Sequence, residues 1–162
     1  MRKIAVGFLA CIAMSGALAN DSMPGKVVSV VDGNTIEMHG SDQEKYIIVL
    51  AGIDSPELTQ KYGEEAKRYL EKLLLQKEVT VHFQGKDRKG NYLAVVLKGK
   101  IDARVELLKE GLAWTAEKDP LPELEAHRTA AQEKGRGLWK EENPTPPWIH
   151  RRQQSTMQPK SS

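Results

Sequence analysis

The chain has 162 residues, of which 40% are hydrophobic and 28% charged, and its formal net charge is +2. This length and composition are those of one ordinary soluble domain with some residues to spare, and they single out no function. A single cysteine, Cys11, excludes an intramolecular disulfide.

Residues 1–19 have the organisation of a cleaved secretory signal. Two basic residues precede an apolar run, and Ala-Leu-Ala at 17–19 fits a signal-peptidase site, so we expect the mature chain to start near Asn20. The run is too short to anchor the protein permanently in a bilayer, so no membrane association is expected after cleavage. Cleavage removes Cys11, and export without disulfides predicts a bacterial periplasmic or secreted protein.

Two alternatives for this segment are weaker. A buried N-terminal helix lacks a polar face, and a lipoprotein attached through Cys11 would leave only a short apolar core. Residues 1–19 also hold two of the 24 basic residues and no acidic one, so the remaining chain has 22 basic and 22 acidic residues. A balanced charge is poor evidence for a nucleic-acid partner.

The predicted domain runs from 26 to 152, after a lead-in at 20–25 and before a disordered C-terminus at 153–162. Its first two strands are expected in a β-hairpin. They are joined at Asp32-Gly33, where glycine accepts a positive φ, and they span Lys26–Val31 and Thr35–His39.

A continuous apolar run at 46–51 predicts a third strand, buried on both faces. Residues 63–75 form the clearest predicted helix, because apolar residues recur at three- and four-residue spacing while charged residues fill the other face. Two more strands are expected at 79–84 and 92–98, on either side of a basic turn.

Two further helices are expected at 103–110 and 121–134, each stopped by a glycine. The rest of the domain is a tail braced by prolines, whose Trp139 and Trp148 are expected to pack on the barrel. Five strands with a helix after the third predict a small closed β-barrel with helices at one side, an α+β fold.

Four motifs stand in order along this domain: Val-x-Asp-Gly-x-Thr at 30–35, Ala-Gly-Ile-Asp-Ser-Pro-Glu at 51–57, Tyr-Gly-Glu-Glu-Ala at 62–66 and Gly-Leu-Trp at 137–139. With this set the chain resembles the staphylococcal nuclease (thermonuclease) family over about residues 26–152. The resemblance implies an OB-fold barrel of five strands with three helices, and calcium-dependent cleavage of phosphodiester bonds in DNA and RNA.

The resemblance also assigns roles to individual residues. It places a metal-binding carboxylate at Asp54, a metal-binding main-chain carbonyl at Ser55 and the general base at Glu57. The family's other metal carboxylate falls on Asn34, and its two arginines fall on Val49 and Asn91. Three of five expected catalytic groups are therefore neutral here, and we expect calcium to bind only weakly.

Other side chains could compensate for these losses. Asp32 is expected to point away from the site because strand side chains alternate, and Lys45 is four residues from position 49, about 13 Å along a strand. Arg88 and Lys89 lie in the same turn as Asn91 and could reach back. The same basic turn, Lys86, Arg88 and Lys89, is a candidate contact for nucleic acid, with a solvated charge run as the alternative.

Three readings of function follow. The leading one is a monomeric, secreted nuclease-fold protein with lost or strongly reduced phosphodiesterase activity that binds nucleic acid or a protein partner. The second is an active calcium-dependent endonuclease in which Arg88, Lys89 or Lys45 replaces the missing arginines. The third is a periplasmic protein-interaction domain with no nucleic-acid role, which the balanced charge favours.

Overall fold

The computed structural model describes residues 22–157, so the predicted signal at 1–19 and the last five residues of the expected disordered C-terminus lie outside the described residues. Within 22–157, no helix is both long enough and apolar enough to cross a bilayer. The first strand begins at Ser22, so most of the expected lead-in belongs to the barrel.

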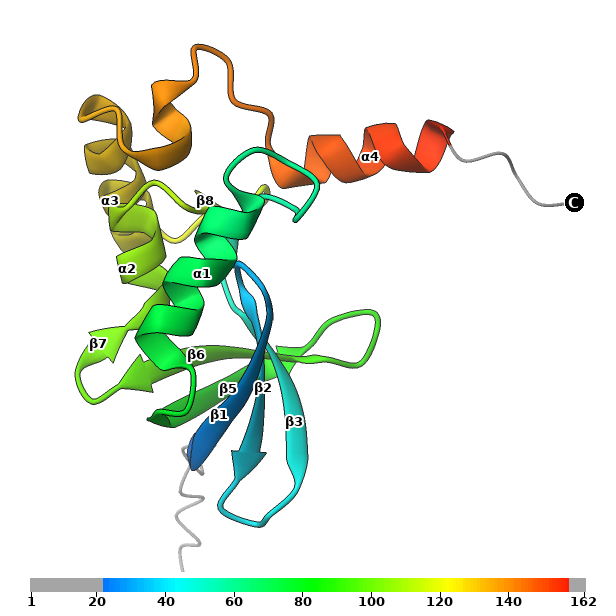
Figure 1. Ribbon diagram of the computed structural model, residues 1–162, viewed down its shortest axis with the longest axis vertical. Helices are drawn as coiled ribbons and strands as arrows, with labels where there is room; N and C mark the ends of the chain where they lie inside the picture. Colours follow the sequence, from blue (N-terminus) through cyan, green and yellow to red (C-terminus); the bar gives the residue numbers. More distant parts are fainter. Residues whose placement is uncertain (1–21, 158–162) are drawn as a thin grey trace, which may run out of the picture.

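Five strands close into a barrel, as the sequence predicts (Figure 1). Four neighbouring pairs are antiparallel, and a parallel pairing between the third and fifth barrel strands closes the circle. In chain order these strands are β1 (Ser22–Asp32), β2 (Thr35–Gly40), β3 (Lys45–Leu50), β5 (Glu78–Lys86) and β6 (Tyr92–Lys98). A short strand, β7 (Ile101–Asp102), pairs antiparallel with β6 outside the circle.

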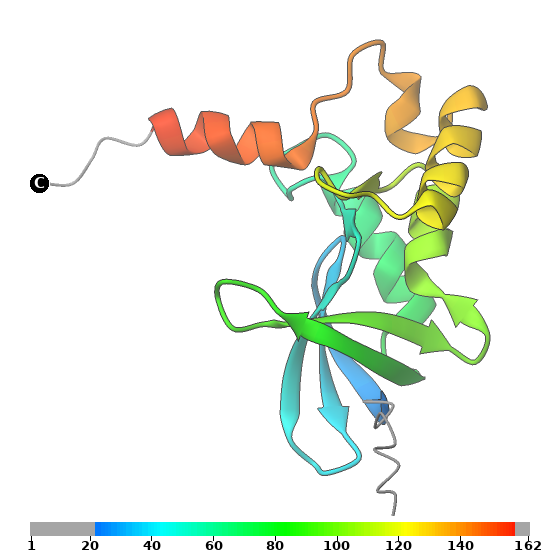
Figure 2. The same ribbon diagram turned by 180° about the vertical axis from the view of Figure 1, so that it is seen from behind.

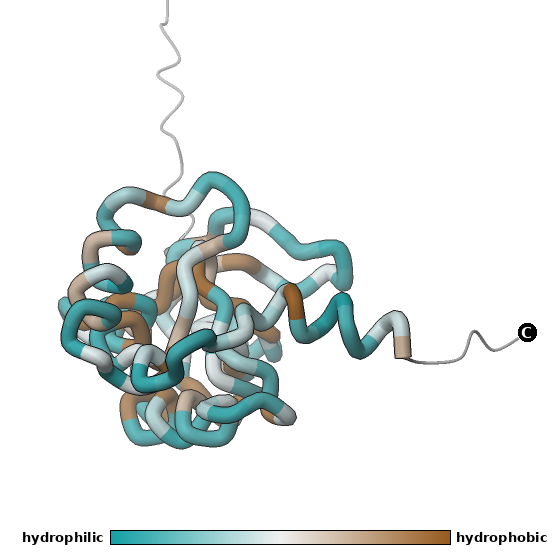
Figure 3. The backbone as a smooth tube through the Cα atoms, turned by 90° about the horizontal axis from the view of Figure 1, so that it is seen from above, coloured by the Kyte–Doolittle hydropathy of each residue, from teal (hydrophilic) through white to brown (hydrophobic). Residues whose placement is uncertain are grey.

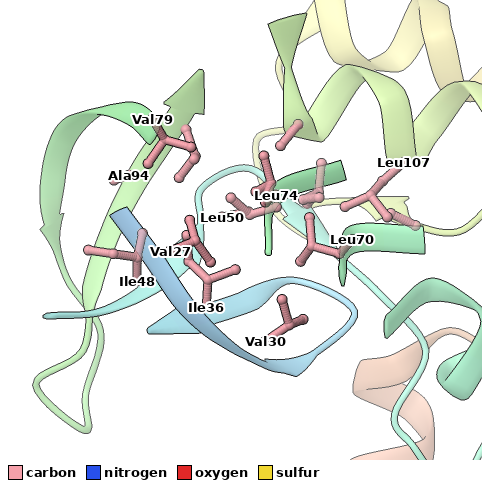
Figure 4. Packing of buried hydrophobic residues seen from close by; sticks show 14 of the residues in the cluster. Val27, Val30, Ile36, Ile48, Leu50, Leu70, Leu74, Val79, Ala94 and Leu107 are labelled. Carbon is pink, nitrogen blue, oxygen red and sulfur yellow. The ribbon is translucent and has the colours of Figure 1, made fainter. Parts of the chain in front are cut away.

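The barrel interior is filled by alternate residues of each strand, as a period of two requires. Val27, Ile36 and Ile48 are fully buried and converge there with residues of the first helix (Figure 4). The expectation that β3 is buried on both faces is wrong: its other face carries Ile47, which is 40% exposed, and the half-buried Val49. That face borders an open cleft instead of a second layer.

Three helices pack at one end of the barrel, close to their predicted bounds (Figure 1). They are α1 (Gly63–Leu74), α2 (Ala103–Lys109) and α3 (Pro122–Glu133), followed by a single 3-10 turn, η1 (Gly137–Lys140). α1 closes the barrel because its apolar stripe, Ala66, Leu70 and Leu74, is fully buried. Two short strands, β4 (Ile53–Asp54) and β8 (Trp114–Thr115), pair beside these helices.

The described residues contain a fourth helix that the sequence did not predict, α4 (Pro147–Met157). The expected disordered C-terminus at 153–162 is therefore wrong for 153–157, which are helical. α4 begins on the body of the protein and then projects sideways (Figures 1 and 2), and its projecting part is mainly hydrophilic (Figure 3). Because it has no apolar stripe, hydrophobic periodicity could not reveal it; Pro147 at its first turn was the available signal.

Candidate functional site

The β1–β2 hairpin and the loop after β4 are in direct contact, so the two polar clusters of the sequence meet. The Ser55 hydroxyl donates to the carbonyl of Gly33 over 3.1 Å, and the Ser55 N–H lies 3.4 Å from Oδ1 of Asn34. Ser55 is buried and acts here as the link between the two segments. The side-chain oxygen of Asn34 is thereby occupied by a main-chain donor.

Glycine is needed at position 33 because of this close approach, and the expected positive φ is not its reason. Gly33 is absent from the positive-φ glycines of the described chain, but a Cβ added to it would lie 2.6 Å from Cβ of Ser55 and 2.8 Å from Cβ of Ala66. Real Cβ atoms do not come that close. The missing side chain lets the hairpin, the Ser55 loop and α1 pack together.

A cleft of about 690 Å³ opens between the β1–β2 hairpin, β3, the loop after β4, the β5–β6 turn and α4. Most of the predicted site residues line it: Asn34, Val49, Asp54, Glu57, Lys89 and Asn91. Arg88 and Lys86 are not among its lining residues, and Nζ of Lys86 instead lies 4.3 Å from the ring centroid of Tyr92. The structure therefore brings together the acidic residues of the site and one cation of the basic turn.

Asp32 also lines the cleft, which corrects the expectation that it points away. The register of β1 against β2 shifts between Val30 and Asp32, and this irregularity breaks the alternation on which the expectation depended. Oδ1 of Asp32 accepts from the main chain of Asn34 over 3.0 Å. Its charge is close enough to act on Asp54, whose pKa it helps to raise.

Carboxylates outnumber cations in this cleft. The carboxylates are Asp32, Glu37, Asp54, Glu57, Asp87 and Glu117, and the cations are Lys89 and Arg151. Two carboxylates have partners that lie outside the lining: Glu37 pairs with Lys45 at 3.0 Å and Glu117 with Arg152 at 2.9 Å. Lys45 therefore pairs with Glu37 and is not itself among the residues that line the cleft.

Arg151 of α4 is bound to the two carboxylates at the centre of the site. Its Nη1 donates to Oδ1 of Asp54 over 3.1 Å and to Oε1 of Glu57 over 2.6 Å, and its Nη2 donates to Oδ2 of Asp54 over 2.7 Å. The contact with Asp54 is bidentate, the geometry for which guanidinium is best suited. These carboxylates, with Asp54 contributing most, raise the pKa of Arg151.

Asp54 remains in an environment that opposes its charge. Burial is the largest cause of its raised pKa, and the charges of Glu57 and Asp32 add to it, while the hydrogen bond from Arg151 acts in the opposite direction. The guanidinium therefore does not fully offset the cost of burying this carboxylate. The side chain of Asp54 is 20% exposed, against 38% for Glu57 and 49% for Arg151.

Aromatic packing brings α4 to this place. Asp54 on β4 is the strand partner of Trp114 on β8, and the Trp114 ring packs edge-on against Trp148 with centroids 5.7 Å apart. Trp148 and Arg151 are three residues apart on α4 and so lie on the same helix face. The sequence predicted that Trp139 and Trp148 pack on the barrel, but both pack on Trp114 of β8, outside the barrel sheet. The contact of Trp148 places Arg151 over Asp54.

The comparisons with known proteins agree with this architecture. A family model described as Staphylococcal nuclease homologue matches residues 47–141. The chain belongs to the staphylococcal nuclease family. An uncharacterized endonuclease of Haemophilus influenzae is 38% identical over 132 residues, covering 80% of this chain and 73% of the relative.

Two further relatives of this nuclease family show its range. An uncharacterized endonuclease of Escherichia coli O157:H7 is 36% identical over 130 residues, covering 78% of this chain and 84% of the relative. A probable staphylococcal-like nuclease, CAN2, of Oryza sativa subsp. japonica is 33% identical over 130 residues, which are 80% of this chain and 34% of the relative. The domain thus occurs both in proteins of similar length and as part of longer ones.

The nuclease-family arginine positions are structural in this chain. The side-chain amide of Asn91 donates to Oδ2 of Asp87 over 3.0 Å, and Oδ1 of Asp87 accepts from the main chain of Asn91 and of Lys89. Asn91 therefore closes its own turn, although it borders the cleft. Val49 supplies an apolar wall beside Val31 and Ile47.

The donor set of the site does not fit calcium as it is arranged. Calcium takes about six to eight oxygen ligands and prefers carboxylates, and within residues 22–157 no three His, Cys, Asp or Glu side chains converge as a metal site requires. Both oxygens of Asp54 accept from Arg151, and the amide oxygen of Asn34 faces the Ser55 N–H. The weak calcium binding expected from the sequence stays a prediction.

Proposed function

We propose that this chain is a nucleic-acid-binding member of the staphylococcal nuclease family with strongly reduced phosphodiesterase activity. The observation that carries the proposal is the engagement of Asp54 and Glu57 by Arg151. A general base must direct an oxygen at the attacking water, whereas Oε1 of Glu57 and both carboxylate oxygens of Asp54 are directed at the guanidinium of Arg151. The general base assigned by the family resemblance is therefore held in a form ill suited to its role.

The neutral residues at 34, 49 and 91 support the same conclusion. A phosphodiester accumulates negative charge in its transition state, and the family resemblance places two arginines where this charge develops. Val49 and Asn91 carry no charge, and Asn34 brings one charge fewer to the metal position. Loss of one such group typically lowers a rate by about a hundred- to a thousandfold, although such losses do not add simply.

Binding is supported by the cleft itself. Its volume of about 690 Å³ is in the range of a ligand site, and its wall combines apolar side chains with Lys89 and Arg151. Val31 and Ile47 are 42% and 40% exposed, and they give this wall an apolar surface that a ligand would cover. Sugars and bases would contact the apolar wall while the cations contact phosphate.

The names of the relatives favour a second candidate, a working endonuclease. Relatives at 36–38% identity are named endonucleases, and they align over 78–80% of this chain. For this chain, that activity has two requirements. Arg151 must release Asp54 and Glu57, and Lys89 must serve as the phosphate-binding cation. A protein-interaction domain without a nucleic-acid role is the third candidate, and failure to bind any oligonucleotide would favour it.

A cleavage assay separates the first two candidates. The protein is residues 20–162, which we propose is exported as a monomer to the bacterial periplasm or the medium, and the substrate is single-stranded DNA with calcium. We expect the wild-type protein and Glu57→Gln to digest DNA at the same background rate. The quadruple variant Asn34→Asp, Val49→Arg, Asn91→Arg, Arg151→Gln is expected to be at least about a hundredfold faster, because it restores the charges that the transition state requires and releases Asp54 and Glu57.

The matched control is the quadruple variant that also carries Glu57→Gln, which should return to background. Calcium-dependent digestion by the wild-type protein that Glu57→Gln abolishes would contradict the proposal and establish the second candidate. Binding is measured separately by fluorescence anisotropy at two salt concentrations, since contacts to phosphate weaken as salt rises.

A further inference from the structure

Arg151 uses only part of its hydrogen-bonding capacity on the two carboxylates. A guanidinium has five N–H groups in one plane, and three of them are accounted for by the bonds to Asp54 and Glu57. Both Nη1 hydrogens and one Nη2 hydrogen are used. Within the described part of the chain, Nε and the second Nη2 hydrogen have no acceptor.

These two remaining donors form one edge of the guanidinium. Nε–H and Nη2–H are parallel, and two parallel donors are what a pair of phosphate oxygens accepts in a bidentate contact. The side chain of Arg151 is 49% exposed and lines the cleft, which leaves room for a ligand beside it. The edge that faces the carboxylates holds the guanidinium in a defined orientation.

We infer that Arg151 takes the place of the family's divalent cation and binds one phosphodiester group of a single-stranded nucleic acid through its free edge. The inference rests on the proposed function and names the residue that performs it. The guanidinium links Asp54 and Glu57 on one side to the phosphate on the other, so binding does not require calcium. Arg151 is a binding residue in this arrangement and also keeps Glu57 engaged.

The charges of the site fit this exchange of cations. A guanidinium carries one positive charge where calcium carries two, and Asn34 supplies no charge where the family has a carboxylate. Compared with the site that the family resemblance implies, this site therefore lacks one negative charge and one positive charge. With Asp32, Asp54 and Glu57 nearby the site keeps an excess of negative charge, so we expect weak affinity and a second contribution from Lys89.

Neighbouring residues of α4 make contacts that help to hold Arg151 in the cleft. Besides the packing of Trp148 on Trp114, Nε2 of His150 lies 2.9 Å from the Thr59 hydroxyl, and the neighbouring Arg152 pairs with Glu117. These contacts keep the first turns of α4 on the body of the protein when a ligand approaches. Arg136 provides a matched control, because its side chain is also 49% exposed and it pairs at 3.0 Å with Glu110, and neither residue lines the cleft.

The test is binding of a fluorescent oligothymidylate to residues 20–162 at low salt with EDTA, followed by anisotropy. We expect the wild-type protein to bind, and Arg151→Gln to bind about tenfold or more weakly, since a charge-assisted bidentate contact is lost. Arg151→Lys should bind with intermediate affinity, because it keeps the charge and loses the fork. Arg136→Gln should remain within about twofold of the wild type, as expected for an exposed pair away from the cleft. Circular dichroism of each variant confirms that it is folded.

Three outcomes would overturn the inference, and they differ in what they say of the proposed function. If Arg151→Gln binds as well as or more tightly than the wild type in EDTA, the arginine blocks the cleft, and the nucleic-acid-binding function stands without it. If the wild type binds only when calcium is added, a metal does what we assign to Arg151. If the wild type binds under neither condition, the proposed function fails together with the inference.

Discussion

Asp54 shows at the scale of one residue how the site is balanced. It is partly buried beside two other acidic residues, and a single guanidinium holds it. Its neighbour on the cleft wall, Glu117, has the opposite situation: it is exposed, and its hydrogen bond with Arg152 is the largest cause of its lowered pKa. The ionised form of the carboxyl group is thus disfavoured at Asp54 and favoured at Glu117.

The two carboxylates should therefore affect stability with opposite dependence on pH. Because the pKa of Asp54 is raised in the folded state, its ionisation costs stability as pH rises through and above the usual aspartate range. Asp54→Asn lacks this loss, so its free energy of unfolding should rise relative to the wild type between about pH 3 and pH 7.

Glu117→Gln provides the comparison. The pKa of Glu117 is lowered, so ionisation stabilises the folded state, and the variant should lose stability relative to the wild type as pH rises through the same range. Urea unfolding at several pH values measures both slopes. Equal slopes for the two variants would contradict the environments described here.

α4 is the element that completes the cleft, and its contacts lie in its first turns. Pro147 is buried at its start, Trp148 and His150 contact the body, and the exposed Arg151 and Arg152 form ion pairs with it. Because the helix has no apolar stripe along its length, it depends on these few contacts for its position. Its attachment should be the part of the structure most sensitive to a single substitution.

Trp148→Ala is expected to release α4 without unfolding the barrel. The loss of an aromatic pair and of partial burial should cost about 1–2 kcal/mol locally. Trypsin cleavage after Arg151 and Arg152 should become faster by about tenfold, which corresponds to this free energy when local opening controls cleavage. Gln154→Ala, in the projecting half of the helix, should leave cleavage unchanged. An unchanged cleavage rate in Trp148→Ala would show that other contacts hold the helix.

At the scale of the whole molecule, one core joins the barrel and the helices. Leu70 and Leu74 of α1 pack among residues of the barrel and Leu107 of α2 (Figure 4). The cleft lies on the outer face of β3 and depends on this core to hold α1 and the hairpin together. Stability and site geometry are therefore coupled through α1.

Leu70→Ala should lower the free energy of unfolding by about 3 kcal/mol, since a fully buried leucine leaves a cavity when it is truncated. Leu58→Ala is the control, because Leu58 is 39% exposed and its truncation should change stability by less than about 0.5 kcal/mol. Chemical denaturation followed by circular dichroism measures both. Equal effects of the two substitutions would show that α1 is not part of the common core.

The elements of the barrel and the first three helices could be predicted from the sequence, because each has a local signal. The hairpin has Asp32-Gly33, α1 has its apolar stripe, and α2 and α3 end at glycines. The ordered motifs also showed which expected catalytic groups are neutral, and the family is confirmed. Local periodicity and turn chemistry depend on neighbouring residues, so one sequence is enough to show them.

The sequence by itself determined the barrel, the family and the neutral residues Asn34, Val49 and Asn91. Only the tertiary structure decided what fills the site. Arg151 is 97 residues from Asp54, and no local pattern connects them. Their contact arises because Trp148 packs on Trp114, which is the strand partner of Asp54, and such packing is determined by the fit of side chains brought together by the whole fold.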